Sequence, residues 1–595
     1  MISILLSLVI FMPMLGSLIL SLASKKRSFL IDTMLPIISL LLLVAVAISF
    51  YGCNLPFIER RVFSVSIFEV GYLVDYFSLS ISFIVLLISS IVALYSLSYF
   101  KNDKKQHRFW FWFNMFVSSM LFLVLSNNLI STFIGWEAIG ACSWALISYY
   151  YDSTKSSTNK IFSTLGAQSI YSGLKALFYT SISDVFLLAF IAIVYFLTYK
   201  NGTPTLEYTS LQYALNLSHE KTIVTMMLAL FLIFGIVGKA AQLPLSSWLP
   251  DAMVAPTPVS ALLHSATVVK APLVLIGRLL IFDSFLVSNS TFQLFAIAFT
   301  LPTIAVASIS AIVENDIKRL LAYSTISQIG FILVGLSLSQ NLSATWGSTF
   351  QLMSHAVLKA TLFLVAGVVI HIYNTNNLEE IKVNIKENSI LFFSALMAVF
   401  SLVGFPPFSG FISKELLFHS IKSYNMVVYA ILLLLSLLTP VYSFKFLTIF
   451  TFEKNIKKED SKEVRSMSSS TFVLSIFSLA LNFLFLFLVN KLDLSIDFST
   501  LFSLDSLLIL TLFIVVSLLS IISFRVRSNL LNTILLTTSK LTTYKGMNIY
   551  FYYGRFSRAC KKFSKIEKLS TSFYVLLVLI GFLIYLSVML VIAIK

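Results

Sequence analysis

Long apolar stretches recur along this chain, and short polar stretches separate them. A helix that crosses a bilayer needs about 20 predominantly apolar residues. Sixteen stretches of about this length occur, at 2–22, 32–51, 77–100, 108–126, 128–150, 171–197, 222–242, 257–282, 291–313, 319–338, 345–372, 389–418, 426–451, 471–490, 504–524 and 571–594. The pattern therefore predicts an all-α, polytopic membrane protein with about 16 transmembrane helices.

Basic residues concentrate in the loops that follow every second span. If the N-terminus lies outside, the inner loops are those at 23–31, 101–107, 151–170, 314–318, 373–388 and 452–470. Lysine and arginine are enriched in the inner loops of membrane proteins, so the number of spans and the orientation support each other. The loop at 52–76 is a small exception, because it leaves Arg60 and Arg61 outside.

Composition supports the membrane assignment. The chain has 595 residues, of which 58% are hydrophobic and 11% charged, and its mean hydropathy is +0.92. A soluble protein has about 25% charged residues. A net charge of +16 would suggest nucleic acid binding in a soluble chain, but the basic inner loops account for it here, so we expect no nucleic acid partner.

The sequence contains none of the short motifs that hold cofactors. Three cysteines (Cys53, Cys142 and Cys560) lie far apart, and six histidines form no HExxH motif. Neither GxGxxG nor GxxxxGK[ST] occurs. We therefore expect no metal, no cofactor and no redox active site in this chain.

The segment at 525–570 differs from the spans around it. Its apolar residues recur at helical spacing, and ten basic residues face a single acid, Glu567. A basic amphipathic helix of this kind lies along a membrane surface, and at 1.5 Å per residue it would extend about 65 Å. The sequence thus predicts a lateral helix followed by an anchor helix at 571–595; a folded basic loop is the alternative.

Two lysines lie in apolar runs that glycine and proline interrupt. Lys239 lies in FLIFGIVGKAAQLPL, and Pro244 and Pro250 after it prevent a continuous helix. Lys414 lies in SLVGFPPFSGFISKELLF. A lysine at bilayer depth costs roughly 2.5–3.5 kcal/mol. Broken helices in corresponding positions of two halves indicate an ion pathway in a transporter-like membrane protein.

Other spans also contain ionisable residues. Glu137 and Lys175 could each reach the interface and water instead of serving a pathway. Histidine has an unperturbed pKa near neutrality, which would suit His264 to proton transfer, although a lone histidine on an apolar helix is more often a hydrogen-bonded core residue. These charge types predict a proton-translocation set of Glu137, Lys175, Asp184, Lys239, His264, His355, Lys359, Lys414 and Glu415.

Several segments resemble one known family. GWEAIGACSWALI, GKAAQLPLSSWLPDAMVAPTPVSALLHSATVV, NDIKRLLAYSTISQIGFILVGL, HAVLKATLFLVAG and GFPPFSGFISKELL are similar, in this order, to segments of the antiporter-like membrane subunits of respiratory complex I. The likeness runs from about 72 to 450. Sixteen spans, a surface helix and a terminal span resemble the distal subunit of its membrane arm.

This resemblance implies an organisation. N-terminal helices at 1–107 would precede two inverted five-helix repeats, at 108–282 and 283–451. Additional helices at 452–524 would lead to the lateral helix on the matrix side. The N-terminus would face the intermembrane space of the mitochondrial inner membrane.

The resemblance also implies a function. The chain would translocate protons as a subunit of NADH:ubiquinone reductase, in contact with membrane lipids and an adjacent antiporter-like subunit. NADH, FMN, iron–sulfur clusters and ubiquinone would bind other subunits. Glu137 and Lys239 would couple in a first channel, Lys359 would lead toward a second, and Lys414 with Glu415 would exchange the proton with the outer phase.

The chain departs from the family pattern at several positions. Ser181, Ser246 and Gln351 stand where the family usually has Arg, His and His, which favours an alternative in which the subunit is a scaffold with a degenerate channel. Lys270 instead resembles the large subunit of Mrp-type cation/proton antiporters, which is a second alternative.

Overall fold

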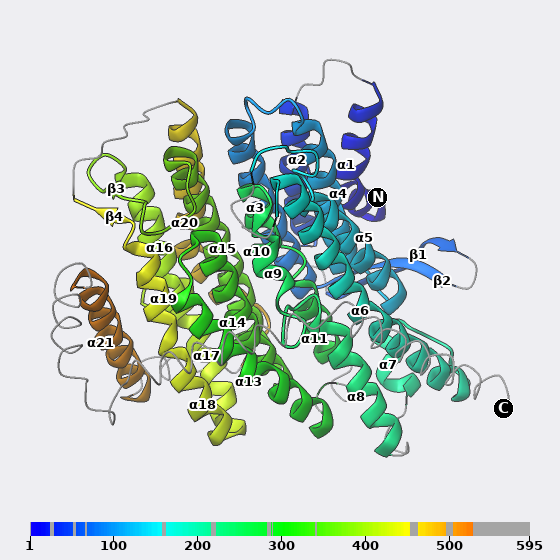
Figure 1. Cartoon of the computed structure of the whole chain (residues 1–595). Coiled ribbons are helices and arrows are strands. Elements are labelled where there is room, and N and C mark those ends of the chain that lie inside the picture. The colour runs from blue at the N-terminus through cyan, green and yellow to red at the C-terminus, as the bar shows by residue number, and fades with distance from the viewer. Residues whose placement is uncertain are drawn as a thin grey trace.

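The chain forms a bundle of helices that stand side by side (Figure 1). The computed structural model describes residues 2–23, 29–50, 55–65, 68–156, 162–215, 222–282, 287, 289–339, 342–452, 462–494 and 504–526. The predicted lateral helix, apart from its first two residues, and the predicted anchor helix lie outside the described residues.

The helices follow the apolar stretches of the sequence. The first half contains α1 (Ile2–Ala23), α2 (Phe29–Ser49), α3 (Tyr76–Tyr99), α4 (Gln106–Leu125), α5 (Leu129–Ile147), α6 (Leu165–Lys200), α7 (Tyr208–Leu215), α8 (Thr222–Val237), α9 (Trp248–Asp251), the short 3-10 helix η2 (Ala252–Val254), α10 (Thr257–Ser265) and α11 (Ala271–Phe282). The second half contains α13 (Ser290–Val313), α14 (Ile317–Ser337), α15 (Leu342–Tyr373), α16 (Ser389–Val403), α17 (Ser409–Tyr424), α18 (Met426–Ser436), α19 (Leu438–Leu447), α20 (Lys462–Lys491) and α21 (Leu504–Val526).

The lengths of these helices suit a membrane. Among the described residues, 11 helices are long and apolar enough to span a bilayer, and four shorter apolar helices accompany them. Every predicted span before residue 525 contains at least one described helix. The prediction of an all-helical, polytopic membrane protein is confirmed.

The described residues contain two small sheets, and one of them lies in a predicted loop. β1 (Phe57–Val65) and β2 (Phe68–Val74) form an antiparallel hairpin that projects from the bundle (Figure 1). The prediction of a plain loop at 52–76 was wrong, because the aromatic and β-branched residues of this segment favour strands although it is too short and charged to span. β3 (Val383–Asn384) pairs in parallel with β4 (Phe450–Thr451).

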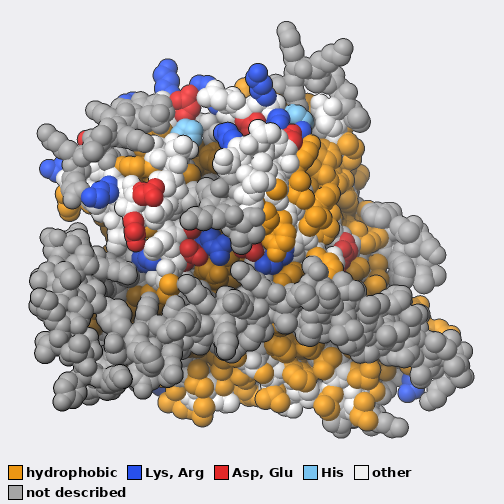
Figure 2. All heavy atoms as spheres, in the orientation of Figure 1, with side chains coloured by type: hydrophobic (Ala, Val, Ile, Leu, Met, Phe, Trp, Pro, Cys, Tyr) orange, Lys and Arg blue, Asp and Glu red, His pale blue; other side chains and the backbone are white. Residues whose placement is uncertain are grey.

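The predicted inner loops lie together at one end of the bundle. Lys105 binds Asp152 across two of them, with 2.7 Å between Nζ and Oδ2. The backbone N–H of Ile317 donates to the carbonyl of Asn376, which joins two more, and the β3–β4 pair joins the last loops. Figure 2 shows charged side chains over the upper part of the molecule, and the described side chains at its lower end are mainly hydrophobic.

Two spans are broken as the sequence predicts. α8 ends at Val237, and the following residues include Ala241 in the left-handed region (φ 51°) before α9 begins. α16 ends at Gly404, whose φ of 98° only glycine adopts readily, and α17 begins at Ser409. Lys239 therefore lies just beyond α8, and Lys414 lies in the second turn of α17.

Another span is broken where the sequence predicted one helix. The stretch at 257–282 divides into α10 and α11, and Lys270 lies at the end of the gap between them. Pro272 falls in the first turn of α11, where its missing N–H costs no helical hydrogen bond. The helix α14 stands beside this break, and it also contacts α13, α15 and α17.

Candidate functional site

Lys239 is completely buried and ion-paired. Its Nζ lies 2.7 Å from Oδ1 of Asp184, and their side chains are 0% and 8% exposed. The indole N–H of Trp136 donates to the same carboxylate oxygen at 2.5 Å. The Lys239 ammonium also lies 4.8 Å from the centre of the Trp136 ring. Side chains from α5 and α6 thus hold the lysine in the break after α8.

The predicted coupling of Glu137 with Lys239 is not an ion pair in this structure, because Asp184 is the residue that pairs with Lys239. Glu137 is exposed on the surface of α5, while its neighbour Trp136 is buried, because consecutive residues of a helix point in different directions. Glu137 still lies within electrostatic range of both Asp184 and Lys239. A charge change at this surface would therefore act on the buried pair.

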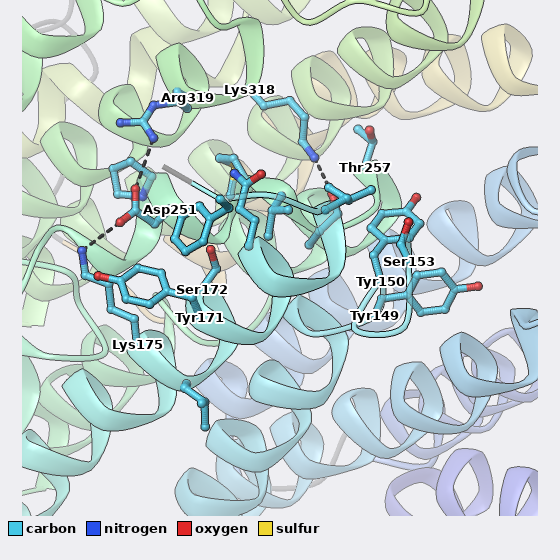
Figure 3. Close-up of a pocket in the computed structure, with 18 of the residues that line it drawn as sticks. Tyr149, Tyr150, Ser153, Tyr171, Ser172, Lys175, Asp251, Thr257, Lys318 and Arg319 are labelled. Atoms are coloured by element: carbon cyan, nitrogen blue, oxygen red, sulfur yellow. Dashed lines mark hydrogen bonds and ion pairs between the residues drawn. The ribbon is translucent and has the colours of Figure 1, made fainter. Parts of the chain in front are cut away.

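Lys175 belongs to a separate cluster. Its Nζ lies 2.8 Å from Oδ2 of Asp251, and Nη1 of Arg319 lies 3.2 Å from the other oxygen of that carboxylate (Figure 3). Nine residues of helix separate Lys175 from Asp184, or about 13.5 Å. The structure thus does not bring Lys175 to the Lys239 pair, although both residues were placed in one set.

The Lys175 cluster lines an open cavity at the end of the bundle that carries the inner loops. The cavity has a volume of about 1520 Å³. Lys318 lies at its inner wall and donates to the carbonyl of Ala255 at 2.5 Å (Figure 3). Asp316, which caps α14 in the adjoining loop, has its pKa raised above the ordinary range because the carboxyl group is buried. The cavity extends along α6 as far as Ser181, three residues before Asp184.

Lys359 and His355 lie together on α15, as their spacing predicts. Lys359 donates to the hydroxyl of Ser324 on α14, and both His355 and Lys359 are 0% exposed. Nδ1 of His355 lies 2.5 Å from Nζ of Lys270. At this distance one nitrogen must offer its lone pair to a proton on the other, so the two groups together hold one proton fewer than their maximum.

His264 lies in the same region and has no hydrogen-bond partner on either ring nitrogen among the described residues. Its ring stacks on Phe363 at 4.5 Å between centres. It lies within electrostatic range of Lys359 and Lys270. A buried polar group without a protein partner indicates ordered water, so the alternative of an ordinary hydrogen-bonded core histidine is not supported here.

Lys414 and Glu415 point apart. Nζ of Lys414 donates to the carbonyls of Leu402 and Val403, at 2.6 and 3.0 Å, at the C-terminus of α16. These carbonyls carry the negative end of the helix dipole and stabilise a cation there. Glu415 instead accepts from the hydroxyl of Ser506 on α21 at 3.0 Å. The predicted Lys414–Glu415 pair is therefore not a contact pair in this structure.

Most of the predicted residues belong to two buried sets, which we together call the line. The first set is the pair of Lys239 and Asp184. The second consists of the central groups and Lys414, and the central groups are His264, Lys270, His355 and Lys359. His355 lies within electrostatic range of Lys270, Lys359, His264 and Lys414. Among the described residues, no group of three or more His, Cys, Asp or Glu side chains could hold a metal ion. The arrangement suits the movement of protons between buried groups.

Comparison with known proteins identifies the family. The family model described as the transmembrane region of NADH:quinone oxidoreductase and Mrp antiporters matches residues 126–439. The model for the N-terminus of complex I chain 5 matches residues 63–110. The chain belongs to this antiporter-like family, with the chain 5 and subunit L proteins of complex I.

Relatives of the same family occur in bacteria and in mitochondria. The chain is 36% identical over 445 residues to NADH-quinone oxidoreductase subunit L of Buchnera aphidicola, which is 72% of this chain and 68% of that protein. It is 32% identical to NADH-ubiquinone oxidoreductase chain 5 of Chondrus crispus, over 70% of this chain and 62% of that protein.

The fold is shared with a protein of known structure. A chain of the Mrp complex from Dietzia sp. aligns with a TM-score of 0.73 at 22% identity, covering 99% of this chain and 63% of that one. At this identity the likeness concerns the fold alone.

Sequence reasoning missed several residues around the line. Trp136 and Ser324 hold Asp184 and Lys359, and neither was singled out. The tryptophan of the GWE segment was a usable signal, but nothing distinguishes Ser324 from the many other serines of the spans. Arg278, another buried cation, pairs with Asp75 at 2.7 Å and is not part of the line.

Proposed function

We propose that this chain is a proton-translocating subunit of the distal membrane arm of complex I, in the mitochondrial inner membrane. The observation that carries the proposal is the buried ion pair of Lys239 and Asp184 at a helix break, together with the buried central groups and Lys414, which lie within electrostatic range of His355. NADH oxidation and ubiquinone reduction would occur in other subunits, with their NADH, FMN and iron–sulfur clusters.

The proposed mechanism is electrostatic. Asp184 stabilises the charged form of Lys239, and a charge change at Glu137 weakens or strengthens that stabilisation. When it weakens, a proton leaves Lys239 toward the central groups. Moving one charge against 100 mV costs about 2.3 kcal/mol, so the driving free energy must come from the rest of the complex.

In the second half of the chain, the lysines that would receive the proton have no carboxylate partner like that of Lys239. The side-chain partner of Lys359 is neutral, the hydroxyl of Ser324. A buried ammonium without a counter-ion is unstable, so Lys359 holds a proton only briefly. Lys414 is better placed for a cation, because two carbonyls at the end of α16 accept from it. This difference favours proton transfer from Lys359 to Lys414. Glu415 would lie on the path by which the proton leaves the subunit.

The surroundings of the subunit follow from the same proposal. The exposed face with Glu137 would meet an adjacent antiporter-like subunit, since a carboxylate on a spanning helix is too costly to face lipid. The repeats at 108–282 and 283–451 would be inverted copies. The N-terminus would face the intermembrane space, and the end with the basic loops, where the lateral helix would also lie, would face the matrix.

The test is the replacement Lys239→Ala in the assembled complex, with NADH-driven proton pumping measured in sealed vesicles. We expect assembly to be retained and pumping to fall. Unchanged pumping with normal assembly would contradict a proton path through this subunit and would favour the scaffold alternative.

A second function, in an Mrp-type cation/proton antiporter, is favoured by one observation. Lys270, the residue that resembles those antiporters, contacts His355 directly in the centre of the line. An antiporter would exchange sodium for protons in vesicles without NADH. Exchange that Lys270→Thr abolishes would support this function over the first.

A further inference from the structure

The segment that carries Lys239 has little regular structure of its own. It comprises residues 238–256, between α8 and α10, and we call it the break segment. Its helices α9 and η2 contain four and three residues. Backbone that is not helical at membrane depth must be held by the protein around it. The position of Lys239 therefore depends on the side chains that bind this segment.

Helix α6 binds the break segment at two places. Near the start of the segment, Asp184 pairs with Lys239 at 2.7 Å. Near its end, Nζ of Lys175 lies 2.8 Å from Oδ2 of Asp251. The indole N–H of Trp248, three residues before Asp251, donates to the carbonyl of the residue before Lys239 at 2.8 Å. A shift at Asp251 would therefore reach Lys239.

Helix α14 binds the same segment as well. Nε2 of Gln242 donates to the carbonyl of Ile326 at 3.3 Å, and Nη1 of Arg319 lies 3.2 Å from Oδ1 of Asp251. The two oxygens of Asp251 thus bind cations on two different helices (Figure 3). Asparagine could not replace Asp251 in this role, because its side chain has one acceptor oxygen and its NH2 group would face a cation.

We propose that Asp251, bound by Lys175 and Arg319, fixes the position of the break segment. This position is the one in which Lys239 meets Asp184. Lys175 is then a positioning residue that keeps its proton, and it acts on the buried pair through the segment, since about 13.5 Å of helix separates it from Asp184. The alternative is the role that the sequence predicts, in which Lys175 itself transfers a proton. This inference rests on the proposed function.

Substitutions of Lys175 separate the two roles. Lys175→Arg keeps a charged partner for Asp251, but a guanidinium does not release its proton in a protein. Proton pumping driven by NADH is measured in sealed vesicles and normalised to assembled complex. We expect Lys175→Arg to keep most of the pumping and Lys175→Met to lose at least half of it. Equal losses in the two variants would show that Lys175 transfers a proton and would overturn the inference.

A substitution of Asp251 tests the other side of the same contact. Asp251→Asn keeps the size of the side chain but removes its charge, and it should lose as much pumping as Lys175→Met. In a cryo-EM map of the assembled Asp251→Asn complex, we expect Lys239 to lie out of contact with Asp184. Normal pumping in this variant, or an unchanged contact between the two residues in the map, would overturn the inference.

Lys105→Met is the matched control. Lys105 also pairs with an aspartate and lines the same cavity, but its partner is Asp152 and not a residue of the break segment. The control should pump normally. A loss as large as that of Lys175→Met would show that any lysine of this cavity has the same effect, which would overturn the specific role of Lys175.

The variant Lys239→Ala distinguishes failure of this inference from failure of the proposed function. Impaired pumping in Lys239→Ala together with normal pumping in Asp251→Asn would overturn the role of Asp251 and leave the proposed function standing. Normal pumping in Lys239→Ala would overturn the proposed function and this inference with it.

Discussion

Lys239 and Asp184 form an ion pair at 2.7 Å although 55 residues separate them in the sequence. The pair joins the break after α8 to the middle of α6. Breaking a buried pair by removing one partner costs about 3–5 kcal/mol, because a charge is left uncompensated. Lys239 can avoid this cost by releasing its proton. The proposed function uses this link between the charge of Asp184 and the protonation of Lys239.

Asp184→Asn should therefore abolish proton transfer through this subunit. Without the carboxylate, the buried ammonium of Lys239 has no counter-ion, and removing one partner of a buried pair costs about 3–5 kcal/mol. NADH-driven pumping in sealed vesicles, normalised to assembled complex, measures the effect. Asp184→Glu keeps the charge and should retain part of the pumping; equal pumping in the Asn variant and the unaltered complex would rule out this role.

Arg278→Ala should destabilise the fold rather than change the pathway. Arg278 pairs with Asp75, the cap of α3, at 2.7 Å, and the two side chains are 3% and 12% exposed. Removal of the guanidinium should cost about 3–5 kcal/mol. The expected result is a lower thermal midpoint and less assembled complex, with pumping per assembled complex retained.

A double variant controls that prediction. Asp75→Asn keeps a side chain able to cap α3, and Arg278→Met fills the space without a charge. Replacing both partners of a buried pair by neutral groups is often nearly neutral, so the double variant should recover most of the lost stability. Failure to recover it would mean that packing of Arg278, not its charge, stabilises this region.

The spans and the breaks could be predicted from the sequence because their causes are local. Runs of about 20 apolar residues give the helices, and Pro244 and Gly404 interrupt two of them through backbone restrictions. Lys239 and Lys414 could be assigned to these breaks for the same reason. The hairpin at 57–74 was missed because its charged residues hid a strand pattern.

The pairing of buried charges could not be predicted, since it depends on how helices pack. The family resemblance coupled Lys239 to Glu137, whereas the packing of α5 and α6 brings Asp184 into contact with it. Lys414 and Glu415 are adjacent on a helix, and adjacent residues do not face each other, so the sequence alone indicates that their side chains make separate contacts.

Asp316→Asn should change how stability depends on pH. Burial raises the pKa of the Asp316 carboxyl above the ordinary value of about 3.9. The folded state therefore binds this proton more tightly than the unfolded state, and the protein loses stability as the pH rises from about 4 past the raised pKa. Asparagine can still accept from the backbone N–H groups of Lys318 and Arg319 but does not ionise.

Thermal midpoints of the two proteins between pH 4 and 7.5 test this. The thermal midpoint of the variant should increase relative to that of the unaltered protein as the pH rises through that interval. The difference between the two midpoints should then become constant. A difference that stays constant with pH would show that ionisation of Asp316 has no effect on stability.

Gly410→Ala should separate the two halves of the broken span that carries Lys414. A Cβ at position 410 would lie 1.7 Å from the carbonyl oxygen of Ser401, which is backbone and cannot rotate away. Overpacking of this kind costs typically about 1–3 kcal/mol, and here α17 must move off α16. Because Lys414 donates to the carbonyls at the end of α16, the same shift should break its contacts, so both the thermal midpoint and the pumping should fall. Gly140→Ala is the control, since its Cβ would meet only Lys239, at an ordinary 3.6 Å. This variant should leave the thermal midpoint unchanged. An unaltered midpoint in Gly410→Ala as well would show that α16 and α17 are not held as closely as their backbones indicate.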